Sequence, residues 1–167
     1  CAMRWDAEKY DSTHAPQIDV GRELIAMAAV RANDSILDIG CGTGKLTCEL
    51  ASLAHKGKVV GIDPSIEMLE RARENALSAG NIALINISAQ RINFREEFDL
   101  AYSNSALQWI KEQEDVTALL YRALKKGGRI AVQLPAKDFC WALIENIYSA
   151  ISTLGIESKY KKMESPW

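Results

Sequence analysis

A short apolar run that ends in an acidic residue and three alternating glycines constrains this chain more than any other stretch. Residues 36–44 read Ile-Leu-Asp-Ile-Gly-Cys-Gly-Thr-Gly, and a helical pattern follows over 45–54. The isoleucines and leucine around Asp38 are typical of a strand that is buried on both faces. The glycines permit positive φ angles and let a ligand approach the backbone closely. Because the loop opens a helix, where N–H groups are free and the dipole is positive, the segment predicts a nucleotide-type site.

The spacing of the glycines separates this loop from two other nucleotide-binding loops. The dinucleotide fingerprint G-x-G-x-x-G has a sixth-position glycine, where this chain has Lys45. A phosphate-binding P-loop has a glycine five residues before its Gly-Lys pair and Ser or Thr after it, and this chain has Ile39 and Leu46 there. The spacing therefore argues against a P-loop. It also disfavours a dehydrogenase, although a dehydrogenase stays open as a less favoured alternative.

Four motifs, taken in order, resemble those of the class I S-adenosylmethionine-dependent methyltransferases. The first is the loop at 38–44, and the second is the pattern Asp-x-Ser-x-x-Met-Leu at 63–69. The third is the stretch 98–109, and the fourth is a Gly-Gly turn at 127–128 that leads into an apolar strand. The resemblance covers about residues 34–135 and implies S-adenosylmethionine as the cofactor, with S-adenosylhomocysteine as the product.

The same resemblance implies which residues bind the cofactor. Asp38 and the glycines would shape the methionine and ribose side, and Asp63, roughly 20 residues further on, would accept from both ribose hydroxyls. Ser88 stands where the family often has an acid for the adenine amino group, and neither Ser88 nor Gln90 brings a charge. We interpret Cys41 as a small residue packed behind the loop rather than as a nucleophile. The expected cofactor-binding set is Asp38, Gly40, Cys41, Gly42, Gly44, Asp63, Pro64, Met68, Ser88, Ala89 and Ser103.

A narrower resemblance concerns the methyl acceptor. Residues 5–10 and 103–109 together look like those of the trans-aconitate and malonyl-thioester carboxyl methyltransferases. This likeness implies that Asn104 lies near the transferring methyl group and that Trp109 begins the wall of the acceptor pocket. Packing of Trp109 under the sheet is an equal alternative. Tyr10 would cap the cofactor site or, alternatively, fix the N-terminal helix.

The expected reaction is methyl transfer to a small molecule, with a carboxylate as the first choice. A carboxylate is ionised at neutral pH and needs no base, whereas a hydroxyl, amine or carbon acceptor often does. His14 is the candidate base, and an exposed loop histidine is the alternative. The candidate catalytic residues are Asn104, Trp109, His14 and Tyr10. An N-, C- or hydroxyl-directed enzyme and a non-catalytic S-adenosylmethionine-binding module are the other two hypotheses.

Alternating patterns along the chain predict an α/β fold with a doubly wound, Rossmann-like parallel sheet in the strand order 3-2-1-4-5. Glycines are expected to end three of the helices. The predicted strands are 35–39, 58–63, 82–87, 98–103 and 129–134; the predicted helices are 19–31, 45–55, 65–79, 112–125 and 138–153, with Gly57, Gly80 and Gly127 as terminators.

The fifth predicted strand would lie at an edge of the sheet. Members of this fold carry two more strands as an antiparallel hairpin, and the 33 residues after Leu134 show no strand pattern. An uncovered apolar edge is an aggregation hazard. We therefore expect residues 1–167 to form a single domain that is incomplete at its C-terminal end. The alternatives are a piece of a longer product and a partner chain that replaces the edge.

Composition limits the partners. The chain is 48% hydrophobic with a net charge of −2, and its interspersed charges lack the basic footprint of a nucleic-acid-binding protein. No run of 18 apolar residues and no signal-peptide pattern is present. The four cysteines lack metal-ligand spacing, so no metal is expected. We expect a cytoplasmic monomer or weak homodimer with a small-molecule acceptor and no nucleic-acid or membrane partner.

Overall fold

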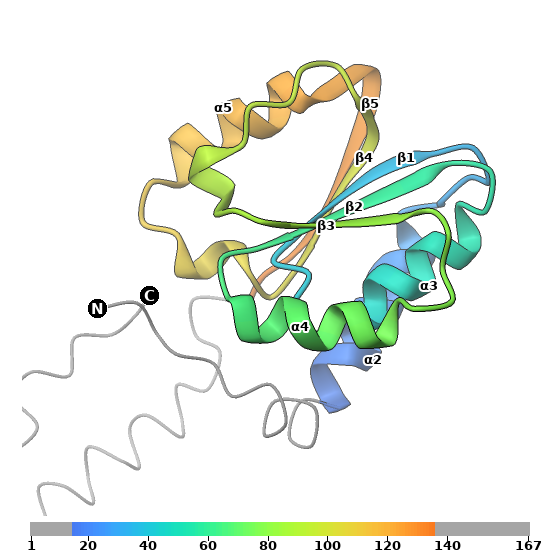
Figure 1. Ribbon diagram of the computed structural model, residues 1–167. Coiled ribbons are helices and arrows are strands. Elements are labelled where there is room, and N and C mark those ends of the chain that lie inside the picture. Colours follow the sequence, from blue (N-terminus) through green and yellow to red (C-terminus); the bar gives the residue numbers. More distant parts are fainter. Residues whose placement is uncertain (1–14, 136–167) are drawn as a thin grey trace, which may run out of the picture. The chain divides into compact units, whose positions relative to one another are not determined.

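A five-stranded parallel sheet is the centre of the computed structural model, which describes residues 15–135 (Figure 1). The strand order is β3-β2-β1-β4-β5, as predicted from the sequence. The strands are β1 (Ser35–Ile39), β2 (Lys58–Asp63), β3 (Ile82–Asn86), β4 (Phe98–Asn104) and β5 (Leu124–Gln133). Tyr10, His14 and the predicted helix at 138–153 lie outside the described residues.

Burial explains the apolar runs in the three central strands. In β1, every residue from Ile36 to Ile39 is buried, and β2 is buried from Val59 onward. Strand β1 pairs with both β2 and β4, so these strands have neighbours on each side as well as helices on each face. The edge strand β3 is far more exposed, although its sequence, Ile-Ala-Leu-Ile-Asn, is at least as apolar as that of β1.

Helices cover the two faces of the sheet. The helices α2 (Ala15–Met27), α3 (Lys45–Leu53) and α4 (Ile66–Asn75) lie on one side and α5 (Gln113–Ala123) on the other (Figure 1). Successive residues of β1 point to opposite faces, so Ile36 joins the core under α2 and α3, and Leu37 joins the core under α5. Two short 3₁₀ helices, η1 (Ala89–Arg91) and η2 (Leu107–Trp109), follow β3 and β4.

Helix α2 occupies a different range from the predicted 19–31. It begins at Ala15 and ends at Met27, and Ala29 has a positive φ of 48°. Beyond that point the Asp34 carboxylate accepts the Arg31 N–H at 2.9 Å. Local side-chain bonds of this kind offer the backbone an alternative to the helix, which explains the early end.

The glycines predicted to end helices lie in the segments that follow them instead. Helix α3 ends at Leu53, before Gly57, and α4 ends at Asn75, before Gly80. Gly127, with φ 79°, lies within β5. Leu124 already pairs with Phe98, and the register then shifts before the next pairs. The prediction for Gly127 was wrong because the positive φ serves an irregularity of the strand rather than a helix end.

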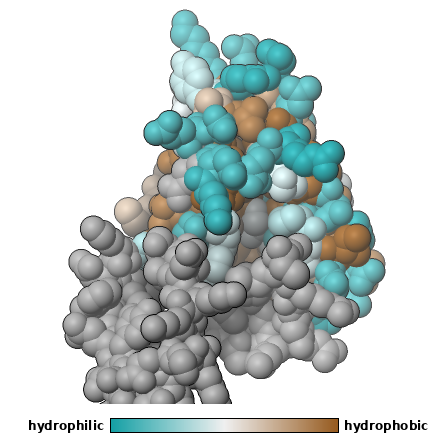
Figure 2. Space-filling view, turned by 90° about the vertical axis from the view of Figure 1, so that its left-hand side faces the viewer, coloured by the Kyte–Doolittle hydropathy of each residue, from teal (hydrophilic) through white to brown (hydrophobic). Residues whose placement is uncertain are grey.

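Three further observations concern the described residues. None of their helices combines the length and the apolar character needed to cross a membrane. No three of their His, Cys, Asp and Glu side chains come together in a way that could hold a metal ion. On the face drawn in Figure 2, hydrophilic side chains alternate with small apolar areas.

Gly57→Ala is expected to destabilise the fold by about 1–3 kcal/mol, the usual range for overpacking. A Cβ at Gly57 would overlap the carbonyl oxygen of Asp34, which is backbone and cannot rotate away. The Lys58 N–H also donates to this oxygen at 3.3 Å. Urea unfolding measures the effect, with Gly80→Ala as the control because nothing lies within 4 Å of its Cβ position. Equal midpoints for the two variants would contradict the prediction.

Candidate functional site

The three alternating glycines form the loop that joins β1 to α3. Gly40, Gly42 and Gly44 have φ angles of 70°, 53° and 76°, all in the left-handed region that glycine favours. The N–H groups of Gly40 and Cys41 donate to the carbonyl oxygen of Ile62 at 2.9 and 3.0 Å, which fastens the loop to β2. The predicted role of the glycines in permitting positive φ is therefore confirmed.

The glycines differ in what surrounds them. A Cβ at Gly40 would overlap the Ala106 side chain, and one at Gly44 would lie 2.9 Å from the Ala72 Cβ. These two glycines thus allow the loop to pack against its neighbours. At Gly42, by contrast, nothing lies within 4 Å of the Cβ position. Gly42 is the position where the loop presents bare backbone to open space.

Asp63 ends β2 directly beside this loop. Its Oδ2 accepts the Gly42 N–H at 3.0 Å and its Oδ1 accepts the Ser65 N–H at 2.8 Å. These bonds set the orientation of the carboxylate, and each oxygen keeps a lone pair for a further donor. Burial raises the pKa of Asp63, and the two backbone N–H groups oppose that rise. Ser65 also caps α4, since its Oγ accepts the Met68 N–H at 3.2 Å.

Asp38 is the fourth of the five residues of β1, next to the last residue before the glycine loop. Its Oδ2 accepts the hydroxyl of Thr47 at 2.6 Å, and both side chains are buried. Burial raises the pKa of Asp38 to about 7; the Thr47 hydrogen bond opposes the rise, and the nearby charge of Asp63 adds to it. Asp38 is therefore partly protonated near neutral pH, unlike a solvated aspartate.

Asp38→Asn is expected to flatten the pH dependence of stability. Between about pH 4, where an unfolded Asp titrates, and about pH 7, the folded chain holds a proton that the unfolded chain has released. The free energy of unfolding therefore falls as pH rises through this window. Asn stays neutral and can still accept from Thr47.

Thermal unfolding followed by circular dichroism between about pH 5.5 and about pH 8 tests this expectation. The Tm of the wild type should fall more steeply than that of the variant, by roughly 3 °C for each kcal/mol involved. Asp19→Asn is the control, since Asp19 is exposed on α2. A wild-type slope that Asp38→Asn leaves unchanged would show that Asp38 is not the group that titrates.

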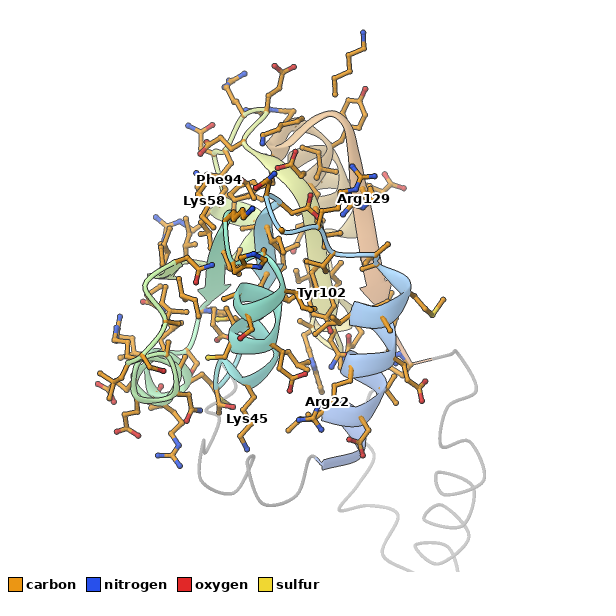
Figure 3. The ribbon with its side chains drawn as sticks, turned by 90° about the vertical axis from the view of Figure 1, so that its right-hand side faces the viewer. Arg22, Lys45, Lys58, Phe94, Tyr102 and Arg129 are labelled. Carbon is orange, nitrogen blue, oxygen red and sulfur yellow. The ribbon has the colours of Figure 1, made fainter. Side chains whose placement is uncertain are left out.

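A cavity lies between the glycine loop and helix α2. Its lining combines loop backbone with side chains from α2, α3 and β4: Gln17, Ile18, Asp38, Gly40, Cys41, Gly42, Thr43, Lys45, Leu46, Tyr102 and Asn104. In Figure 3, Lys45 is at the start of α3, and Arg22 extends from the neighbouring helix α2. This cavity is at the carboxyl ends of β1 and β4, where ligands of open α/β sheets bind.

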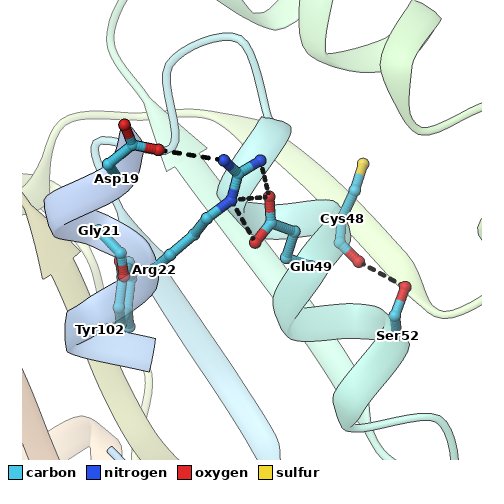
Figure 4. A network of polar contacts seen from close by, with 7 residues as sticks. All are labelled: Asp19, Gly21, Arg22, Cys48, Glu49, Ser52 and Tyr102. Carbon is cyan, nitrogen blue, oxygen red and sulfur yellow. Dashed lines mark hydrogen bonds and ion pairs between the residues drawn. The ribbon is translucent and has the colours of Figure 1, made fainter. Parts of the chain in front are cut away.

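Polar contacts hold α2 over this cavity. The Tyr102 hydroxyl donates to the Gly21 carbonyl at 2.8 Å, and Arg22 forms a two-pronged ion pair with Glu49 of α3, with a shortest distance of 2.8 Å (Figure 4). Burial raises the pKa of Tyr102, so its phenol stays protonated and donates. Asn104 adds a third contact, since its Nδ2 donates to the Gln17 carbonyl at 3.0 Å.

Two amide oxygens near the end of β4 are buried without a hydrogen-bond partner. They are the Oδ1 of Asn104 and the Oε1 of Gln108. A buried acceptor left without a donor is costly, and a bound ligand with N–H or O–H groups would relieve that cost at Asn104. Asn104 also lines the cavity, so its Oδ1 is suited to a ligand there.

The structure brings together only part of the residue set expected from the sequence. Asp38, Gly40, Cys41, Gly42 and Asn104 line the cavity, and Asp63 joins them through Gly42.

The remaining candidates do not line this cavity. Met68 is buried in α4, Pro64 is exposed, and Ala89 packs in the core under α5. Ser103 is buried, and its hydroxyl donates to the Ile39 carbonyl at 3.0 Å. Their places in the expected set, and those of Gly44 and Ser88, stay predictions.

Trp109 ends η2 with 41% of its surface exposed, so it is not the core residue that one alternative expected. Sequence reasoning missed Thr47, Gln17 and Tyr102. Thr47 was readable in principle, as a polar residue on the buried stripe of α3. Gln17 and Tyr102 had no such signal, because the chain packs α2 against β4 only in three dimensions.

These residues fit S-adenosylmethionine, the cofactor that the motifs imply. The bare backbone at Gly42 leaves room for a ligand, and the Asp63 carboxylate keeps lone pairs that suit a ribose diol. The partnerless Oδ1 of Asn104 suits an ammonium donor. The described residues therefore offer acceptors for the donor groups of the cofactor.

Comparisons with known proteins agree with the family that the motifs imply. A family model described as a methyltransferase domain matches residues 36–128, more than half of the chain. The chain is 34% identical over 137 residues to a trans-aconitate 2-methyltransferase of Deinococcus radiodurans, covering 80% of this chain and 50% of that protein. The chain thus spans about half the length of several curated relatives that it matches.

Two solved methyltransferase structures superpose on this chain. A SAM-dependent methyltransferase from Aquifex aeolicus superposes with a TM-score of 0.68 at 20% identity, covering 77% of this chain and 72% of that one, which shows the fold. Phosphoethanolamine N-methyltransferase 2 of Haemonchus contortus, solved in complex with S-adenosyl-L-methionine, superposes with a TM-score of 0.65 at 26% identity, covering 70% and 28%.

Proposed function

This chain belongs to the methyltransferase domain family, and from this premise we propose that it transfers a methyl group to a carboxylate oxygen of a small molecule. S-adenosylmethionine is the cofactor. The observation that carries the proposal is the pairing of Asp63 with the bare backbone of Gly42 at the carboxyl ends of β1 and β2. The similarity to a trans-aconitate 2-methyltransferase supports a carboxylate acceptor.

Each residue of the site has a task that follows from its contacts. Asp63, oriented by Gly42 and Ser65, accepts the ribose hydroxyls, and the N–H groups and dipole at the start of α3 add a positive potential. Asn104 offers its Oδ1 to the amino group of the methionine part. When bound, the cofactor supplies an electrophilic methyl group, whose bonding electrons stay on the departing sulfur as a new carbon–oxygen bond forms.

A carboxylate acceptor needs none of the titratable side chains along the cavity as a base. Among the described residues these are Asp38, Cys41, Lys45 and Tyr102. Asp38 accepts from Thr47, and Tyr102 donates to Gly21. Burial raises the pKa of Cys41 well above its ordinary value, so the thiolate is disfavoured. A carboxylate is already ionised, and positioning it against the methyl group can supply a large part of the rate acceleration.

Three of the candidate catalytic residues keep their roles as proposals. Trp109 is exposed on η2, close in sequence to Asn104, and is available as a wall of the acceptor pocket. Tyr10 and His14 belong to the undescribed N-terminal segment. We propose Tyr10 as a cap of the cofactor site, and His14 as the base if the acceptor is a hydroxyl, amine or carbon.

An amine acceptor is the second candidate, favoured by the structural similarity to phosphoethanolamine N-methyltransferase 2. The two candidates differ in the bond they make, since an ester is cleaved by mild alkali and an N-methyl group is not. The test incubates the full chain with S-adenosylmethionine labelled in the methyl group and with trans-aconitate, other small carboxylates or ethanolamine compounds. Alkali-labile label on a carboxylate supports the proposal; stable label on an amine supports the alternative.

Cofactor binding is tested separately by calorimetric titration with S-adenosylhomocysteine, with NADH as the control. Binding of S-adenosylhomocysteine without transfer to any acceptor would favour a non-catalytic binding module. Binding of NADH instead would overturn the assignment of the loop.

A further inference from the structure

Gln133 lies at the carboxyl end of β5, beside the cofactor cavity. It pairs in register with Asn104, which lines that cavity, and neighbouring strands are about 4.8 Å apart. Gln133 is half-buried, so a bound molecule at this end of the sheet can still reach it. No role described above uses this side chain.

Ser105 holds Gln133 by two hydrogen bonds. The Ser105 N–H donates to the Gln133 carbonyl at 3.0 Å, and the Ser105 hydroxyl donates to the Gln133 Oε1 at 2.6 Å. Because the second bond occupies Oε1, the orientation of the carboxamide is set, and its NH₂ group is left for another partner. Among the residues that the structure describes, the Nε2 of Gln133 has no acceptor.

Ser105 adopts a backbone conformation that serine rarely takes. Its φ is +54°, in the left-handed region that is unfavourable for residues other than glycine. Such strain persists where surrounding contacts over-determine it, and it concentrates at binding and catalytic sites. Here the strained conformation accompanies the two bonds that orient Gln133.

We propose that the NH₂ group of Gln133 binds the carboxylate of the methyl acceptor, so that Gln133 determines specificity for an anionic substrate. The inference rests on the proposed function. A carboxamide donates two N–H groups without a formal charge. It can therefore hold one carboxylate oxygen while withdrawing less electron density than a guanidinium would, which leaves the other oxygen nucleophilic.

The test compares Gln133→Glu and Gln133→Met with the wild type. A glutamate has nearly the same shape and can still accept from Ser105, but it presents an anion to the acceptor. A methionine keeps the length and removes the donors. Lys56→Met is the control, because Lys56 is exposed just before β2, at the end of the sheet opposite the glycine loop.

Three quantities are measured on the full chain: KM and kcat for the carboxylate that the wild type methylates, and the calorimetric affinity for S-adenosylhomocysteine. We expect KM to rise about tenfold in Gln133→Met, because the hydrogen bond to the acceptor carboxylate is lost. In Gln133→Glu we expect a rise of about 100-fold, because the glutamate also repels that carboxylate. The change in kcat should be small, and the affinity for S-adenosylhomocysteine should stay within about twofold of the wild type.

The outcomes separate this inference from the proposed function. If the wild type methylates carboxylates and Gln133→Glu leaves KM unchanged, the role of Gln133 is overturned and the proposed function stands. A loss of S-adenosylhomocysteine affinity parallel to the rise in KM would also overturn it, because the residue would then support the fold or the cofactor. If the wild type methylates no carboxylate, the proposed function falls, and this inference falls with it.

Discussion

Gly42→Val should abolish cofactor binding while the protein stays folded, lowering the affinity for S-adenosylhomocysteine by about 100-fold or more, equivalent to about 2.7 kcal/mol. No atom lies within 4 Å of the Cβ position at Gly42, so the side chain would not clash within the protein. It would instead project into the space proposed for the cofactor. A branched residue at a φ of 53° would also strain the loop that donates to Asp63.

Gly127→Val separates these two causes. Gly127 also has a positive φ, 79°, and open space around its Cβ position, but it lies in the irregular part of β5. Both variants should lose similar stability, and only Gly42→Val should lose binding. Calorimetric titration measures affinity and thermal unfolding measures stability. Normal affinity in Gly42→Val would mean that the cofactor does not approach this loop.

Asp63→Ala should weaken binding of S-adenosylhomocysteine by roughly 3 kcal/mol, or about 100-fold. Hydrogen bonds to a charged group are each worth about 1.5–3 kcal/mol, and the ribose offers two hydroxyls to this carboxylate. The substitution also removes the acceptor of the Gly42 N–H at 3.0 Å and the Ser65 N–H at 2.8 Å. Some loss of stability is therefore expected along with the loss of affinity.

Asp99→Ala controls for that loss of stability. Asp99 likewise accepts a backbone N–H, from Ser35 at 2.8 Å, and it pairs with Lys125 at 2.7 Å. It stands at the start of β4, at the opposite end of the sheet from the glycine loop. Asp99→Ala should lose stability and keep its affinity for S-adenosylhomocysteine. If the two variants bind it equally well, Asp63 does not contact the ribose.

The fold was predictable because its strongest signals are local. The buried strands β1 and β2 appear at the predicted residues, and the glycines between β1 and α3 have the positive φ angles that their spacing implied. Burial on both faces forces an unbroken apolar run, and only glycine takes such angles without strain. Both constraints act within a few residues, so they can be read along the chain.

The errors occurred where distant contacts override local patterns. Gly127 follows a helical pattern, yet Leu124 leaves α5 to pair with Phe98, which is 26 residues earlier. Helix α2 ends at Met27 because Asp34 takes the Arg31 N–H and is itself held by Arg129 at 2.6 Å. The bond between Asp34 and Arg31 is local, but Arg129 is 95 residues from Asp34 and Phe98 is 26 residues from Leu124, so a short window of sequence shows neither of these partners.

The candidate site also combines features that the local sequence predicts with features that only tertiary contacts determine. The loop and Asp63 pointed to the cofactor at the level of the sequence, through the resemblance of their motifs to those of the methyltransferase family. The raised pKa of Asp38, the cover that α2 forms through Tyr102 and Asn104, and the orientation of Gln133 by Ser105 came only from tertiary structure. The hydrogen bonds join residues 28 to 87 positions apart, so they exist only once the chain has folded. Burial and these hydrogen bonds determine the protonation and the orientation of the side chains in the site.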